Sequence, residues 1–165
     1  MKWFKLIACL TVLSGFLIII ASCKKDSDLK NDTIITKSLP MSASQEVPAN
    51  PSTATGTIDL TYNRGTKVMT YTVTWSGLTD TLVAMHIHNT ADPGFNAGVL
   101  QNIITTSNGI ATPGAKFIKS GTISATLYID GQVFKEENLL ANKYYMNIHT
   151  KTYPGGEIRG QLNLR

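Results

Sequence analysis

The feature that most constrains the fold of this chain is a repeated alternation of apolar and polar residues in short runs separated by turn residues. In residues 68–76 the large apolar side chains occupy every second position: Met69, Tyr71, Val73 and Trp75. Successive side chains of a β-strand point to opposite faces, so this run predicts a half-buried strand with its threonines toward solvent. A similar run at 56–62 precedes the turn Asn63-Arg64-Gly65, which predicts an antiparallel hairpin.

The same alternation predicts further strands at residues 81–88, 99–106, 121–129, 144–149 and 157–164. The prolines of residues 38–55 favour an edge strand followed by a loop. Only residues 133–142 have helical spacing, with room for one or two turns. Many short strands with almost no helix predict an all-β fold, either a Greek-key β-sandwich or a closed barrel.

The chain concentrates its histidines in two of the predicted strands: His86, His88 and His149. Alternation directs Val83, Met85 and Ile87 toward the core, so the first two imidazoles share the opposite face. Applied separately to residues 144–149, it also places the third imidazole on the face away from the core. This agreement is a condition for one shared site.

Two interpretations of the histidines remain open. A His-x-His pair and a third imidazole from a neighbouring strand could hold Cu(II) or Zn(II) and leave a position free for water or substrate. Alternatively, the imidazoles hydrogen-bond to the backbone, Tyr145, Asn147 or Glu157 and fix the geometry of the sheet and loops. A metal site requires the three imidazoles to converge within about 5 Å of a common point.

The N-terminal residues have the features of a bacterial lipoprotein signal. Residues 1–22 contain a short basic start and an apolar stretch shorter than a transmembrane helix usually requires, and small residues precede Cys23. We therefore expect a cleaved signal peptide at 1–22, a lipidated Cys23 with a flexible tether at 23–37, and a β domain at 38–165. An uncleaved anchor is the alternative. Both place the protein at the cell envelope, and lipidation predicts the outer membrane or the cell surface.

Composition excludes several classes of function. The formal net charge of +4 includes Lys2 and Lys5, so the chain without its signal carries about +2, spread without a basic patch, and we do not expect nucleic-acid binding. Both cysteines precede residue 38, so no disulfide stabilises the domain. The sequence has no nucleophile elbow, P-loop or dinucleotide motif. Asp92 and Asn96 provide too few oxygens for Ca(II), and Asp92 is interpreted as a turn residue.

Three phrases in order resemble the CHRD domain, a family named after chordin and found in many bacterial secreted proteins. They are QEVP at 45–48, MHIH at 85–88, and YMNIHT at 145–150 with PGGEIRGQL at 154–162. The resemblance covers residues 38–165, although Asn89–Pro93 replaces the family's usual Gly-rich continuation. It implies an immunoglobulin-like β-barrel remotely similar to Cu/Zn superoxide dismutases, with no settled activity. The phrases contribute residues to which we assign structural roles: Glu46, Pro48, Gly155, Gly156, Glu157, Arg159 and Gly160.

These observations predict a lipid-anchored, non-enzymatic CHRD-domain protein that has a structural role or binds a protein or polymer ligand at the envelope. The alternative is a mononuclear Cu or Zn protein using His86, His88 and His149, in which Arg159 could attract an anion. No catalytic residue is assigned. We do not expect dismutase activity, because no fourth imidazole is left to bridge to a second metal.

Overall fold

The computed structural model describes residues 32–105 and 119–164. These residues form an all-β fold, as predicted, with one short 3-10 helix and one short α-helix. The elements are β1 (Thr33–Ser42), η1 (Ala43–Gln45), β2 (Thr55–Asn63), β3 (Val68–Ser76), β4 (Leu82–His88), β5 (Val99–Thr105), β6 (Gly121–Tyr128), α2 (Glu136–Leu140), β7 (Tyr145–Thr150) and β8 (Ile158–Gln161).

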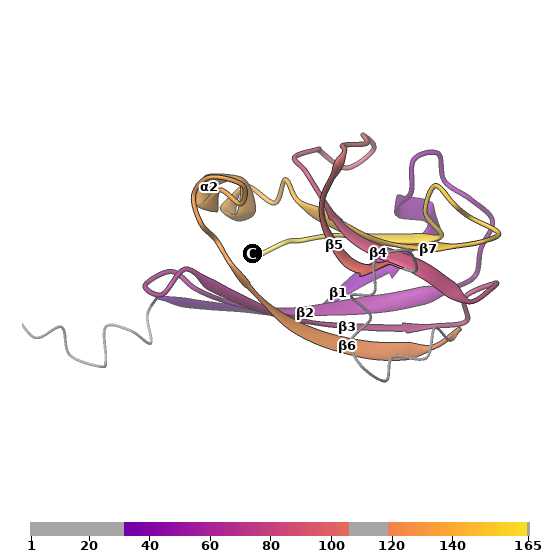
Figure 1. The fold of residues 1–165 in the computed structure, drawn as a ribbon, viewed down its shortest axis with the longest axis horizontal. Coiled ribbons are helices and arrows are strands. Elements are labelled where there is room, and N and C mark those ends of the chain that lie inside the picture. Colours follow the sequence, from indigo (N-terminus) through magenta and orange to yellow (C-terminus); the bar gives the residue numbers. More distant parts are fainter. Residues whose placement is uncertain (1–31, 106–118, 165) are drawn as a thin grey trace, which may run out of the picture.

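All eight strands belong to one antiparallel sheet in the order β5-β4-β7-β8-β1-β2-β3-β6. The sheet curls so that β1, β2, β3 and β6 lie in one layer and β4, β5 and β7 in the facing layer (Figure 1). Pairing of Ser42 with Arg159 joins β1 to β8. The outer strands β5 and β6 are the two ends of the sheet. The expected sandwich or barrel is therefore one curled sheet, a half-barrel whose concave side encloses the core.

The hairpin of β2 and β3 forms as predicted, with continuous register from Thr55 opposite Ser76 to Asn63 opposite Val68. Its inward-facing residues are all buried: Ile58, Leu60, Tyr62, Met69, Tyr71, Val73 and Trp75. They pack with inward residues of the facing layer in one apolar cluster. Burial of each large apolar side chain stabilises the folded state by about 1.5–3 kcal/mol relative to leaving that side chain exposed. This cluster fixes the inner side of β4 and β7, and hence the direction in which their other side chains point.

In β4, the prediction for one core residue was wrong. Met85 and Ile87 are buried as expected, but Leu82 is buried in place of Val83, which is only half-buried. The register with β7 shifts between Leu82 and Ala84. A bulge adds one residue to a strand and reverses its alternation, so the inward position moves from Val83 to Leu82.

The start of the β domain at residue 38 was predicted too late. Residues 33–36, expected to belong to the tether, form the first part of β1 and pair with residues 60–63 of β2. They are Thr-Ile-Ile-Thr, a β-branched sequence that suits a strand. Residues 1–31, including the expected signal peptide and Cys23, lie outside the described part. Within residues 32–105 and 119–164 no helix is long and apolar enough to cross a membrane.

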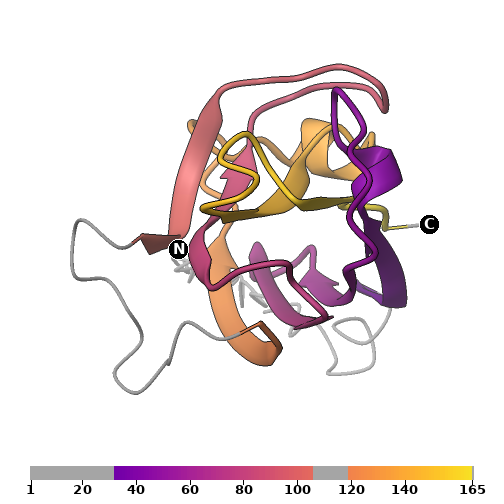
Figure 2. The ribbon, with the colours of Figure 1, turned by 90° about the vertical axis from the view of Figure 1, so that its right-hand side faces the viewer.

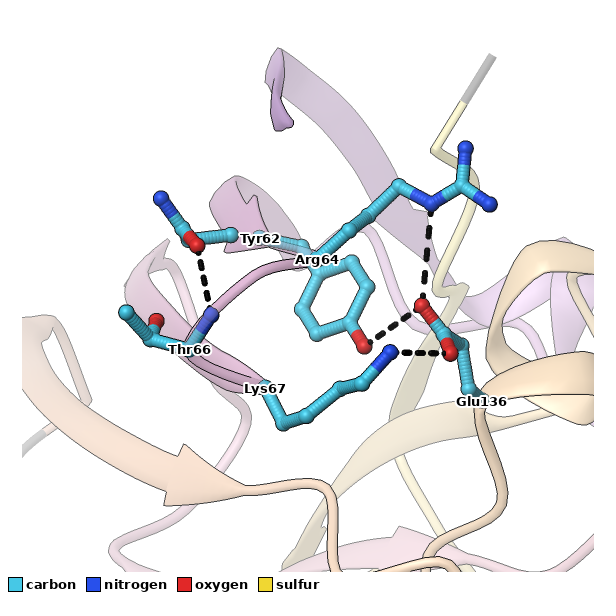
Figure 3. A network of polar contacts seen from close by, with 6 residues as sticks. Tyr62, Arg64, Thr66, Lys67 and Glu136 are labelled. Carbon is cyan, nitrogen blue, oxygen red and sulfur yellow. Dashed lines mark hydrogen bonds and ion pairs between the residues drawn. The ribbon is translucent and has the colours of Figure 1, made fainter. Parts of the chain in front are cut away.

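The α2 helix, a single turn within the predicted segment 133–142, is tied to the β2–β3 hairpin by Glu136 (Figure 3). Its carboxylate accepts hydrogen bonds from the Tyr62 hydroxyl at 3.0 Å and Lys67 Nζ at 2.6 Å. Arg64 Nε lies 3.6 Å from the same carboxylate. These contacts hold the chain between β6 and β7 against the opposite layer, which positions the start of β7.

Candidate metal centre

Polar residues cross the outer face of β4, β7 and β8, on the side away from the apolar core. The strand register aligns Ala84 with His149; His86 with Asn147 and Arg159; and His88 with Tyr145 and Gln161. Alternation turns the polar members of these rows to the same side. The prediction that the three histidines share one face is therefore confirmed, and the register makes them neighbours.

Loops cover much of this face. His88 and His149 are each 8% exposed and Asn147 is 1% exposed. The loop between β4 and β5 extends over the sheet toward the loop after β1 (Figure 2), where Asn96 Nδ2 donates to the Val47 carbonyl oxygen at 2.7 Å. His86 is only half-buried. The histidine face is thus a covered polar layer that is most accessible at His86.

The three imidazoles converge. Their ring centroids lie 4.6 Å apart for His86 and His149, 5.7 Å for His86 and His88, and 6.3 Å for His88 and His149. One ring nitrogen from each histidine lies within 4.8 Å of those of the other two. The convergence required for a metal site is therefore present among the described residues.

Backbone carbonyl groups orient two of the rings. His88 Nδ1 lies 2.8 Å from the Ala97 carbonyl oxygen, and His149 Nδ1 lies 2.9 Å from that of Pro154. A carbonyl oxygen only accepts hydrogen bonds, so both Nδ1 atoms carry the proton. Both Nε2 atoms face Asn147, whose Oδ1 lies 2.8 Å from each. In neutral rings these Nε2 atoms present lone pairs.

The third ring, His86, has a buried Nδ1 without a hydrogen-bond partner in the described part of the chain. Burial, and then the proximity of His149 and His88, lower the pKa of His86 to about 4. Burial also lowers the pKa of His149, against the raising effect of its bond to Pro154. Both rings are therefore neutral at pH 7, the form that binds metal ions.

Arg159 is not available to attract an anion, as the metal interpretation had suggested. Its guanidinium carbon lies 3.4 Å from the ring centroid of Tyr145, and Nη1 donates to the Phe95 carbonyl oxygen at 2.9 Å. The residue is 1% exposed. On its other side the Tyr145 ring stacks with His88 at 4.5 Å between centroids. Arg159 therefore packs the covering loop onto the face that carries the histidines.

Glu157 does not hydrogen-bond to the histidines or pair with Arg159 in the described structure. Its carboxylate accepts from Ser52 Oγ at 2.7 Å, from the backbone N–H and the Oγ1 of Thr79 at 2.7 and 2.8 Å, and from Thr150 Oγ1 at 2.7 Å. Burial raises the pKa of Glu157, but these hydrogen bonds outweigh it and hold the pKa below its usual value. The carboxylate joins loops that meet at one end of the sheet.

The family-phrase glycines differ in their surroundings. Gly156 has a φ of +129°, and a Cβ there would lie 2.3 Å from Glu46 Oε1. A Cβ at Gly160 would lie 2.8 Å from Met41 Cγ, whereas one at Gly155 would meet nothing within 4 Å. Close approach therefore requires glycine at 156 and 160 but not at 155. Pro48 follows a cis peptide bond in the loop that begins at Glu46.

The turn predicted at Asp92 is confirmed, because its carbonyl oxygen accepts from the Phe95 N–H at 3.1 Å. Its carboxylate pairs with Lys143. Asn147 was considered only as a hydrogen-bond partner of the histidines, and the structure places it at the centre of the site. The orienting carbonyl groups of Ala97 and Pro154 were not foreseen, because every residue has a carbonyl and no residue type signals which one meets a histidine.

The description of the family model that matches this chain is CHRD domain, and the match covers residues 38–162. A search of curated proteins and a search of solved structures found no significant match.

Proposed function

The chain belongs to the CHRD domain family, and from this premise we propose that it is a binding module whose ligand is a divalent transition-metal ion, Cu(II) or Zn(II), held by His86, His88 and His149. The observation that carries the proposal is the convergence of three ring nitrogens within 4.8 Å, one of them on a half-buried histidine with an unpartnered Nδ1. Borderline-soft ions of this type prefer imidazole nitrogen over the oxygen ligands that suit Ca(II) and Mg(II).

The surroundings of the rings support this choice. Metal-ligating histidines usually donate their second ring N–H to a carbonyl or carboxylate, which fixes the tautomer and the ring orientation. His88 and His149 make such contacts with the carbonyl oxygens of Ala97 and Pro154. His86 is the least buried of the three histidines, so we propose that an ion enters on its side. We propose binding and not catalysis.

The test is the metal content of the purified protein after dialysis against Cu(II) or Zn(II), compared with His149→Ala and Asp92→Ala. We expect one tightly held ion per chain in the parent and in Asp92→Ala, because Asp92 is an exposed carboxylate paired with Lys143. His149→Ala should lose most of the ion. Equal and substoichiometric metal in all three proteins would refute the proposal.

A second candidate is that the histidines serve only as a hydrogen-bonded scaffold in a module for a protein or polymer ligand. The contacts of His88 and His149, which give both ring nitrogens a neighbour, favour it. On this hypothesis His149→Ala lowers stability without changing metal content. The metal-content measurement therefore separates the two functions.

The cellular place of the module is a separate proposal: a lipid on Cys23 anchors the protein at the bacterial cell envelope. It rests on the signal-like residues 1–22 and the small residues before Cys23. The test is mass spectrometry of the mature N-terminus together with fractionation of the parent and Cys23→Ser. An acylated Cys23 and loss of membrane association in the variant are expected, whereas an unmodified cysteine would contradict the anchor.

A further inference from the structure

The side chains around Asn147 bring hydrogen-bond acceptors together with no donor between them. The Nδ1–H groups of His88 and His149 donate to carbonyl oxygens, so both Nε2 atoms present lone pairs if the rings are neutral. Each Nε2 lies 2.8 Å from Asn147 Oδ1, which also only accepts. Three acceptors thus face one another in a site that is almost closed to water.

One cation placed between the three acceptors removes this repulsion, because each lone pair then faces a positive charge. The two Nε2 atoms and Asn147 Oδ1 are already close enough together to share such an ion.

The separation of the acceptors fits metal coordination. Two ligands at right angles, each about 2.0 Å from a metal ion, lie about 2.8 Å apart, as in tetragonal Cu(II) sites with nitrogen and oxygen ligands. Both Nε2 atoms have this separation from Asn147 Oδ1. His86 faces the same group from the neighbouring strand, at a centroid distance of 4.6 Å from His149.

The other end of the Asn147 amide is directed toward Glu46. A Cβ built on Gly156 would lie 2.8 Å from Asn147 Nδ2 and 2.3 Å from Glu46 Oε1, so both atoms pack on the same glycine. A carboxyl oxygen accepts hydrogen bonds and an amide nitrogen donates them, so Glu46 on the Nδ2 side favours the orientation that points Oδ1 at the histidines.

We propose that Asn147 Oδ1 is a fourth ligand of the metal site, giving an ion coordinated by three imidazole nitrogens and one amide oxygen. This inference rests on the proposed function and adds a ligand to it. Asn147 is 1% exposed and lies directly across from His86 in the strand register. Its position is therefore fixed by the sheet and not by a loop.

An amide turned by 180° is the competing arrangement. Amide oxygen and nitrogen are nearly equal in size, so their partners decide which atom faces the rings. In the turned form Nδ2 would donate one hydrogen to each Nε2, and an entering metal would have to displace these bonds. The fourth-ligand arrangement predicts that removing the side chain weakens metal binding, and the turned arrangement predicts that it strengthens binding.

The experiment is calorimetric titration of the purified protein with Cu(II), using the parent, Asn147→Ala, Asn147→Asp and Asn102→Ala. Asn102 is the matched control, because it is an exposed asparagine paired with His86 from the opposite side, on β5. We expect Asn147→Ala to bind about 10- to 100-fold more weakly. Asn147→Asp should bind at least as tightly as the parent, since it keeps an oxygen in place, and Asn102→Ala should match the parent.

A spectroscopic measurement on the parent does not depend on the folding of any variant. Asparagine labelled with ¹³C at the side-chain carbonyl should give a ¹³C hyperfine coupling to bound Cu(II) in electron–nuclear double resonance. The coupling should be absent in Asn147→Asp, whose residue 147 carries no label.

The possible failures can be told apart. If the parent binds Cu(II) through His149 but Asn147→Ala binds equally or more tightly and no ¹³C coupling is seen, the fourth ligand is wrong and the three-histidine site stands. If the parent binds no ion, or if His149→Ala binds as the parent does, both the fourth ligand and the proposed function are wrong.

Discussion

Adjacent glycines at the end of the β7–β8 connection illustrate how strongly the effect of one methyl group depends on its surroundings. Gly156 has a left-handed φ and lies against the side chains of Glu46 and Asn147. Gly155 has neither constraint. The two glycines of the Pro-Gly-Gly phrase cannot be distinguished from the local sequence, because neither the φ angle nor the contact with Glu46 can be predicted from it.

We predict that Gly156→Ala lowers the free energy of unfolding by about 2–4 kcal/mol, from backbone strain and a clash with a buried carboxyl group. Gly155→Ala is the matched control and should change it by less than about 0.5 kcal/mol. Urea unfolding followed by circular dichroism measures both. Equal effects of the two substitutions would show that the contact with Glu46 is not the cause.

Glu46 is a buried acid whose ionisation opposes folding. Burial raises the pKa of Glu46 to about 7, above the ordinary value of 4.5. At a pH between 4.5 and 7, Glu46 is ionised in the unfolded chain but keeps its proton in the folded protein. Glu46 therefore reduces the free energy of unfolding progressively as pH rises from 4.5 to 7. Below pH 4.5 both states are protonated and the loss disappears.

We therefore predict that Glu46→Gln raises the free energy of unfolding at pH 8 by about 1–3 kcal/mol, the range that a shift of this size allows. At pH 5 the gain should be much smaller. The measurement is urea unfolding of parent and variant at both pH values. An equal change at both would mean that the charge of Glu46 is not responsible.

At the scale of the elements, alternation predicted the strands well because each strand's inner face packs on one apolar core. It erred where the backbone departs from a regular pleat, at the bulge between Leu82 and Ala84. The β2–β3 hairpin could be predicted from local residues, but its link to α2 through Glu136 could not, since Lys67 and Glu136 are 69 positions apart in the sequence. Pairing over such distances depends on the topology of the sheet.

The Glu136 contacts give a pH-dependent prediction. The hydrogen bond from Lys67, followed by one from Tyr62 and the nearby cationic charges, outweighs burial and lowers the pKa of Glu136. Its contribution to stability is therefore present above the unfolded pKa and is lost as pH falls through the folded value.

Glu136→Gln should lower the free energy of unfolding by about 0.5–1 kcal/mol at pH 7, because the partners are partly exposed to solvent. The difference between parent and variant should be smaller at pH 3 than at pH 7. The exposed neighbour Glu137 provides the control substitution Glu137→Gln, which should have little effect at either pH. Thermal unfolding at the two pH values tests this, and a difference as large at pH 3 as at pH 7 would contradict it.

For the whole molecule, the sequence predicted which face the histidines share but not how that face is closed. Their common side follows from alternation in two separate strands, and their proximity follows from β4 lying next to β7. The cover of the site comes from the loop between β4 and β5, which Arg159 holds through the Phe95 carbonyl oxygen. Loop conformation depends on contacts across the sheet, such as Asn96 with Val47, that no periodicity encodes.

A metal ion bound by His86, His88 and His149 would join two central strands, so the proposed function predicts a change in the stability of the whole domain. An ion that binds only the folded chain stabilises it by about 2.7 kcal/mol when its free concentration is 100 times Kd. For a domain of this size, that corresponds to a rise in Tm of about 10 °C. Differential scanning calorimetry with and without Cu(II) or Zn(II) measures the shift, which should be absent in His149→Ala. An equal shift in parent and variant would place the bound ion elsewhere, since residues outside the three-histidine group would then hold it.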